Sequence, residues 1–191
     1  MAFAASASAT TVTSPTGTAY TSTIHATSEG HAILHGPTGE VECPSTVEGK
    51  VESHGNGVTA EGKISVLTFG HEGNPCTNSW HVTVVTPGSL QIHWKANHEG
   101  TLTSTGATVT TTRFGITCNY LTNATDIGVV TDSHTAGDEK PANETKEGTA
   151  TLHIEAKIPR HTGSSGLCGT EPAEWTGSYI VNTPDKLYID A

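Results

Sequence analysis

Short runs in which polar and apolar residues alternate, separated by turn residues, extend along the chain from Thr18 onward. The alternation is clearest in residues 63–69 and 149–156. It predicts β-strands with one buried face, because successive side chains of a strand point to opposite sides of the sheet. In the first of these two runs the alternation breaks at Leu67. The runs span residues 18–25, 31–35, 39–43, 58–69, 80–86, 89–94, 101–113, 116–120, 126–131, 148–158, 175–181 and 186–189. About a dozen short strands with frequent turns predict an all-β sandwich or barrel.

These strands and the residues between them follow an order that occurs twice. Each copy has a cysteine, two strands, a second cysteine, a tryptophan, a further strand and a Thr-Pro-x-x-Leu-x-Ile string. The positions are Cys43, Cys76, Trp80 and 86–92 in the first copy, and Cys118, Cys168, Trp175 and 183–189 in the second. We therefore predict an internal duplication, with two homologous β-units at 18–95 and 96–191 that pack as a pseudo-symmetric sandwich or barrel. The polar segment 134–147 is predicted to be a surface loop.

The four cysteines are even in number, widely spaced and without a Cys-x-x-Cys motif, so they predict two disulfides rather than a zinc or redox site. Four cysteines allow three connectivities. The duplication favours the one in which each copy closes its own loop, Cys43–Cys76 and Cys118–Cys168. Each such loop is expected to stabilise the fold by about 3–4 kcal/mol.

The N-terminal segment, residues 1–17, is rich in Ala, Ser and Thr and is predicted to be a flexible tail. Ala2-Phe3-Ala4 has the small-x-small form of a signal-peptidase site, which indicates the remnant of a signal peptide. No apolar run approaches the about 18 residues that a membrane-spanning helix needs, so membrane insertion is not expected. With the predicted disulfides, these features favour a bacterial protein that is secreted or on the cell surface.

Composition and charge limit the fold classes and the binding partners that can be expected. Thr is the most abundant residue, and only 15% of residues are charged, against about 25% in an average soluble domain. The β-branched Thr side chain suits strands, which excludes a helical bundle or coiled coil. The net charge is -10, and the 9 Lys and Arg residues are scattered singly, so nucleic acid is not an expected partner.

Candidate chemistry is sparse. His31 and His35 have the spacing of helical metal ligands, but on a strand residues four apart lie roughly 13 Å from each other, so no metal site is predicted. No phosphate-binding glycine loop, nucleophile elbow or free reactive cysteine is found, and no cofactor is expected. The sequence therefore predicts a protein that is not an enzyme.

Aromatic residues are few, and the three tryptophans divide into two kinds. Trp80 and Trp175 hold equivalent places in the two copies, which favours a structural role beside each disulfide. Trp94 has no counterpart and lies at the end of a predicted strand. An exposed ring there would stack on a sugar, whereas a buried ring would cover the contact between the two units.

The strings Trp80–Ile92, Asn123–Gly128 and Leu167–Tyr188 resemble secreted β-rich proteins of actinobacteria, a group without an assigned function. The resemblance covers most of the chain from Thr18 onward. It implies an exported, disulfide-containing β domain from a bacterium, and it transfers no site residue.

Three hypotheses of function follow. The first is a non-enzymatic extracellular or cell-surface structural protein, with the N-terminal segment adding as a strand to a neighbouring copy to build a homo-oligomer or filament. The second is a carbohydrate-binding module that uses Trp94 to bind surface glycans. The third is a hydrolase of polysaccharide or cell wall, which needs paired carboxylates in a cleft.

Overall fold

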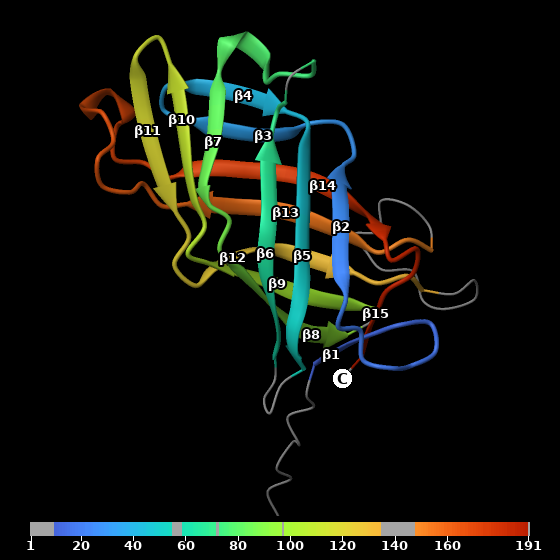
Figure 1. The fold of residues 1–191 in the computed structure, drawn as a ribbon. Coiled ribbons are helices and arrows are strands. Elements are labelled where there is room, and N and C mark those ends of the chain that lie inside the picture. The colour runs from blue at the N-terminus through green and yellow to red at the C-terminus, as the bar shows by residue number, and fades with distance from the viewer. Residues whose placement is uncertain (1–9, 55–58, 72, 97, 135–147, 191) are drawn as a thin grey trace, which may run out of the picture.

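The computed structural model describes residues 10–54, 59–71, 73–96, 98–134 and 148–190, and its regular structure is almost entirely β-strand (Figure 1). The strands are β1 (Thr11–Thr13), β2 (Thr23–Ser28), β3 (Ala32–Gly36), β4 (Gly39–Cys43), β5 (Ser45–His54), β6 (Thr59–Phe69), β7 (His81–Thr86), β8 (Ser89–Ala96), β9 (Glu99–Thr105), β10 (Thr108–Arg113), β11 (Ile116–Leu121), β12 (Thr125–Thr131), β13 (Thr151–Ile158), β14 (Ala173–Thr183) and β15 (Tyr188–Asp190). Two single-turn 3-10 helices, η1 (Thr77–Ser79) and η2 (Gly166–Cys168), precede β7 and β14. Within the described ranges no helix is long and apolar enough to cross a membrane.

Eight strands form a closed barrel in the order β2-β5-β6-β8-β9-β12-β13-β14, and pairing between β13 and β14 closes the ring. The prediction of an all-β fold is confirmed, and of the two architectures that the sequence left open, the molecule has the barrel. Residues 18–95 contribute four adjacent strands of the ring and residues 96–191 the other four. Apolar side chains of alternate strand positions fill the interior, among them Ala26, Ile64 and Leu102.

Two further groups of strands extend the barrel at one end (Figure 1). The first half of β14 pairs with β3, which carries β4 at its far edge, while the second half of β14 pairs with β2 inside the ring. Strands β7, β10 and β11 form a separate three-stranded sheet, here called the outer sheet. Strand β7 of the outer sheet is followed directly in the sequence by β8 of the barrel wall.

The other end of the barrel is covered by β1 and β15, which pair with each other (Figure 1). Thr10 fixes β1, because its Oγ1 accepts a hydrogen bond from the backbone N–H of Trp94 at 2.8 Å. Buried Asp132 fixes β15, because its Oδ2 accepts from the backbone N–H of Ile189 at 3.1 Å. Val12 has no exposed surface. The predicted tail over residues 1–17 is therefore wrong for residues 10–13, which form part of the folded body; residues 1–9 lie outside the described residues, as does nearly all of the predicted 134–147 loop.

The broken alternation at Leu67 has a simple cause. Glu48 of β5 lies opposite Val66, but the next residue of β5, Gly49, lies opposite Ile64, so β6 has one extra residue at this point. A bulge of this kind shifts the side-chain phase of the strand by one position. Ile64 before the bulge and Leu67 after it are consequently both buried.

The pairings of the barrel and its extensions fall into corresponding pairs when each strand of the first half is matched to one of the second. The pairing β2–β5 corresponds to β9–β12, β5–β6 to β12–β13, β3–β4 to β10–β11, β6–β8 to β13–β14, β8–β9 to β14–β2, and β7–β10 to β14–β3. In this scheme β14 corresponds to β7 and β8 together. The strand arrangement is pseudo-symmetric, and the duplication of the sequence itself stays a prediction.

The register places the two repeated tryptophans at matching points. On β3, the residue two positions beyond the partner of Cys43 is Leu34, and it lies opposite Trp175. On β10, the residue two positions beyond the partner of Cys118 is Arg113, and its guanidinium lies 5.4 Å from the centre of the Trp80 ring. Each tryptophan therefore packs against the hairpin that belongs to the other half of the chain.

The disulfides connect Cys43 with Cys76 and Cys118 with Cys168, so the predicted connectivity is confirmed. Their sequence separations are 33 and 50 residues. On the chain-entropy model each bridge stabilises the fold by about 4 kcal/mol. Disulfides of this kind are typical of proteins that fold in an oxidising compartment.

Replacing Gly128 by Ala should destabilise the protein by about 3 kcal/mol or more. Gly128 has φ +145°, and the Cβ of any other residue there would overlap the backbone carbonyl of His153 on the neighbouring strand. Gly106→Ala is the matched control, because Gly106 has φ +75° but open space around it, and it should cost about 1 kcal/mol. Urea unfolding of both variants measures the difference, and equal losses would contradict the explanation by backbone contact.

Replacing Asp132 by Asn should flatten the pH dependence of stability. Burial raises the pKa of Asp132 above its ordinary value of 3.8, so the folded protein binds a proton there more tightly than the unfolded chain. The stabilising contribution of that proton is complete below about pH 3.8 and is lost as the pH rises through the folded-state pKa. An amide loses no proton and can still accept from Ile189. Unfolding free energies from pH 3 to about 7 should therefore show the variant gaining on the wild type as the pH rises; a constant or shrinking difference would refute this.

Candidate functional site

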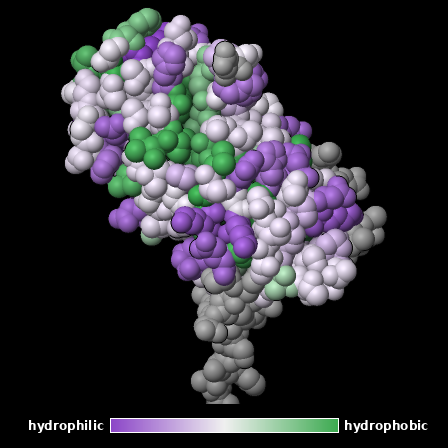
Figure 2. Space-filling model, viewed as in Figure 1, coloured by the Kyte–Doolittle hydropathy of each residue, from purple (hydrophilic) through white to green (hydrophobic). Residues whose placement is uncertain are grey.

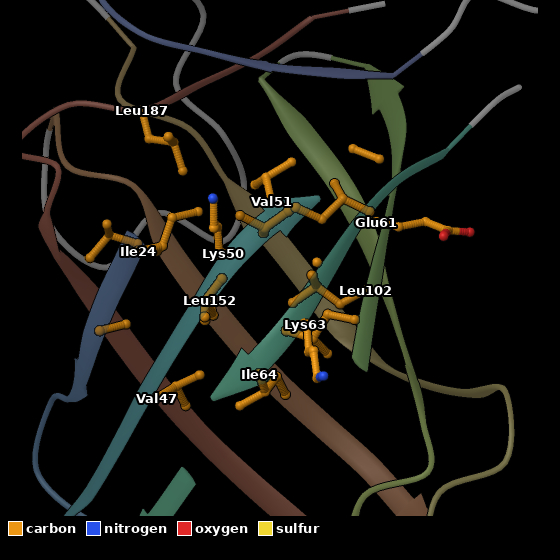
Figure 3. A pocket seen from close by; sticks show the side chains of 18 residues that line it. Ile24, Val47, Lys50, Val51, Glu61, Lys63, Ile64, Leu102, Leu152 and Leu187 are labelled. Carbon is orange, nitrogen blue, oxygen red and sulfur yellow. The ribbon is translucent and has the colours of Figure 1, made fainter. Parts of the chain in front are cut away.

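The barrel interior is too full to be a ligand site. One cavity inside it has a volume of about 70 Å³ and is walled by side chains such as Val51, Leu102 and Leu152 (Figure 3). A second cavity, deeper between Leu67 and Tyr179, has about 20 Å³. Pockets for small molecules usually measure about 300–1,000 Å³. The interior of this barrel is therefore a packed core.

A larger hollow of about 340 Å³ lies between the end of β6 and β7, and we call it the β6–β7 groove. It is lined by Phe69, Gly70, His71, Pro75, Cys76, Trp80, His81, Val82 and Thr83. Figure 2 shows apolar side chains gathered on this face of the molecule, near the outer sheet. The Cys43–Cys76 disulfide closes one end of the groove, since Cys76 is part of its lining.

The groove exists because β7 separates from β6. Strand β6 pairs with β8 from Thr59 to Lys63, and the N–H of Ile64 still bonds the carbonyl of Gly88 at 3.1 Å. Beyond Ile64 no pairing with β7 is found among the described strands. In the other half, β13 pairs with β14 without interruption from Thr151–Ile180 to Ile158–Ala173. The difference lies at Pro87-Gly88, which bends the chain between β7 and β8 where β14 runs straight on.

Strand β7 consequently has one paired edge and one open edge. It pairs with β10 alone among the described strands. Its sequence, His-Val-Thr-Val-Val-Thr, has high β-propensity and contains no Asp, Glu, Lys, Arg, Pro or Gly. Val82 and Val84 are half-buried, and Val85 is 63% exposed. Proteins usually block such an edge with charge, Pro or a covering segment. β7 has no Asp, Glu, Lys, Arg or Pro, and no strand in the described part of the chain pairs with its second edge.

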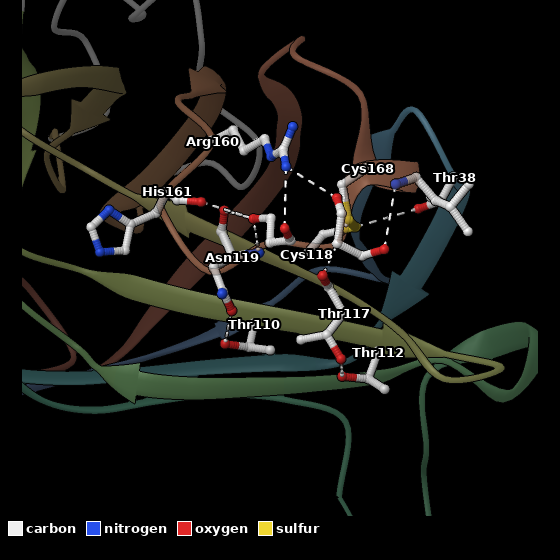
Figure 4. Close-up of a disulfide and its surroundings, with 12 residues drawn as sticks. Thr38, Thr110, Thr112, Thr117, Cys118, Asn119, Arg160, His161 and Cys168 are labelled. Carbon is white, nitrogen blue, oxygen red and sulfur yellow. Dashed lines mark hydrogen bonds between the residues drawn. A yellow bond between two sulfur atoms is a disulfide. The ribbon is translucent and has the colours of Figure 1, made fainter.

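Two other strand edges of the molecule are covered. At β4 the backbone N–H of Glu42 donates to the Thr77 hydroxyl of η1 at 3.1 Å. At β11 the segment 159–168 lies along the edge, where Ser165 N–H donates to the carbonyl of Thr117 and the Ser164 hydroxyl accepts from Asn119 N–H (Figure 4). Each cover is tied to the fold by one of the two disulfides. The open edge of β7 is therefore an exception within the same molecule.

The large apolar side chains that are most exposed in the described part of the chain lie on the outer sheet or on η2, which contacts β11. They are Val85 on β7, Phe114 at the β10–β11 turn with 84% exposure, and Leu167 on η2 with 69%. The Arg113 guanidinium lies between the rings of Trp80 and Phe114, 5.4 Å and 4.8 Å from their centres. Exposed apolar groups collected on one element mark a contact surface more often than scattered ones do.

The residues that the sequence singled out lie elsewhere and do not converge. Trp94 is half-buried and packs against the core beside β1, so its role as a sugar platform stays a prediction. His31 and His35 each lie beside a glutamate of β4, with nitrogen–oxygen distances of 3.5 Å to Glu42 and 3.6 Å to Glu40. Across the described ranges, no three potential metal ligands come together.

The clearest buried ionisable group, Asp132, has a structural role. Its carboxylate lies 3.0 Å from Nδ1 of His98 and holds β15 across the barrel end. It does not open into either the groove or the internal cavities, whose linings exclude it. The β7 edge was missed because the sequence shows a strand but not its neighbours; its run of Val and Thr without charge was the signal available.

Comparison with known proteins adds no assignment, since no family model, curated protein or solved structure matches this chain.

The open edge of β7 predicts a distinctive pattern of amide exchange. Alternate N–H groups of residues 81–86 point away from β10 and should exchange far faster than the amides of β13, which has paired neighbours on both sides. Hydrogen exchange followed by NMR measures this residue by residue. Uniform protection along β7 would show that another segment covers the edge.

Proposed function

We propose that this protein is an exported, non-enzymatic structural protein whose copies assemble into filaments by strand addition. The observation that supports this function best is the open edge of β7 beside the β6–β7 groove. An unpaired edge can bind an extended segment through its backbone N–H and C=O groups. Export is supported by the two disulfides and their oxidising compartment.

The positions of the two ends favour an open chain of subunits. The described chain starts at Thr10, next to β1 at one end of the barrel, while the outer sheet is at the other end (Figure 1). If the N-terminal segment of one copy binds the outer sheet of the next, the contact joins two different surfaces. Such head-to-tail contacts produce filaments when the rotation between copies does not close a ring.

The glycan-binding alternative now has a different residue as its basis. Trp94 is half-buried, whereas Phe114 is 84% exposed and lies on Arg113. A glycan array with Phe114→Ala as control tests this second proposal, and a signal that is unchanged in the variant would remove Phe114 from it.

Negative-stain micrographs of the purified protein should show filaments, and deletion of residues 1–9 should abolish them. The deletion stops before Thr10 because Thr10 and Val12 are buried parts of the body. The truncated protein should keep its circular dichroism spectrum and nearly its melting temperature, and sediment as a monomer. Monomers of the untruncated protein over the micromolar range, or filaments that persist after the deletion, would contradict the proposal.

A further inference from the structure

Resting on the proposed function, we infer that the β6–β7 groove is the acceptor site, and that it binds residues 2–9 of a neighbouring copy as an added strand along β7. The site thus has a defined partner, a second copy of this chain.

The first support is the backbone of β7. Its six residues, His81–Thr86, offer alternate N–H and C=O groups on the side away from β10. Six paired residues need about 20 Å of extended chain. The nine residues that precede Thr10 can span at most about 30 Å, which exceeds the length of β7 by about 10 Å.

The second support is the match of side chains. In the segment, Phe3, Ala5, Ala7 and Ala9 alternate with residues that include Ser6 and Ser8. As a strand, the segment would have one small apolar face and one hydroxyl face. The groove wall includes the rings of Phe69 and Trp80, which are 6% and 4% exposed, so it offers an apolar surface to the apolar face of the segment.

The third support is charge. The protein has a net charge of -10, yet the first charged residue of the chain is Glu29, and β7 has no Asp, Glu, Lys or Arg. A segment without charged side chains that binds along a strand without Asp, Glu, Lys or Arg does not bury an unpaired charge of its own, which would be costly. In the other half of the chain, the edge that corresponds to the open edge of β7 is already occupied, because β14 pairs with β13 there. A segment could bind at that edge only if β13 separated from β14.

The test uses the truncated protein that lacks residues 1–9, and a fluorescent peptide of residues 1–10 with blocked ends. Fluorescence anisotropy should show saturable binding. Ala7→Glu in the peptide should weaken binding by about tenfold or more, because it places a charge in the groove, whereas Ser8→Glu, on the outer face, should leave it within about twofold. These peptide variants cannot affect the folding of the protein.

Variants of the groove test the same contact from the side of the acceptor protein. Val82→Lys, in the groove lining, should weaken binding by about tenfold or more, while Ser22→Lys, at an exposed position outside β7 and the groove, should bind as the parent does. Equal binding to both proteins, equal effects of the two peptide changes, or no binding would overturn the acceptor site. Filaments that disappear with residues 1–9 but persist in Val82→Lys would overturn the site and leave the proposed function standing. Peptide binding in the groove without filaments of the untruncated protein would confirm the site and refute the filament.

Discussion

The exchange of strands between the two halves of the chain holds this molecule together. Strand β3 of the first half pairs with β14 of the second, and β10 of the second half pairs with β7 of the first. Neither half contains all the pairing partners of its own hairpin, so neither can complete its sheet alone. The closed barrel, with four adjacent strands from each half, follows the same rule. The two disulfides then secure each half internally, while backbone pairing secures the halves to each other.

The same exchange explains why a single dipeptide changes the surface so much. In the second half one straight strand, β14, pairs with β3, β13 and β2. In the first half the corresponding strand is divided by Pro87-Gly88 into β7, which stays with β10, and β8, which stays in the barrel. Pro has no N–H to donate, and Gly88 has φ +76°, with the backbone of Ala107 where a Cβ would be. The groove therefore results from a bend at one point of a strand arrangement that the two halves otherwise share.

The order of residues along the chain was enough to predict the disulfides and to mark the bulge. It could not predict which strands pair across the molecule. The disulfide connectivity and the matching of Trp80 with Trp175 were accessible because the order of residues repeats. The broken alternation at Leu67 marked a real bulge. Alternation fixes which face of a strand is buried but not which strand lies beside it, so the crossing of β7 to β10 was hidden. Thr10 and Val12 looked like part of a tail because their burial comes from β8 and β15.

The open edge of β7 differs from two other strand edges of the same molecule. The edges of β4 and β11 are covered by segments that disulfides hold in place, so the chain has the means to cover an edge. At β7 the equivalent cover would have to come from β6, and the bend at Pro87-Gly88 prevents it. The unsatisfied N–H and C=O groups can then bond water or another chain. Copies with a net charge of -10 repel each other once they come within roughly 10 Å, the distance beyond which salt screens charge, and a segment without charged side chains adds nothing to this repulsion. Residues 1–9 contain no Asp, Glu, Lys, Arg or Pro and directly precede the buried Thr10, so they fit the proposed role of covering β7 of the next copy.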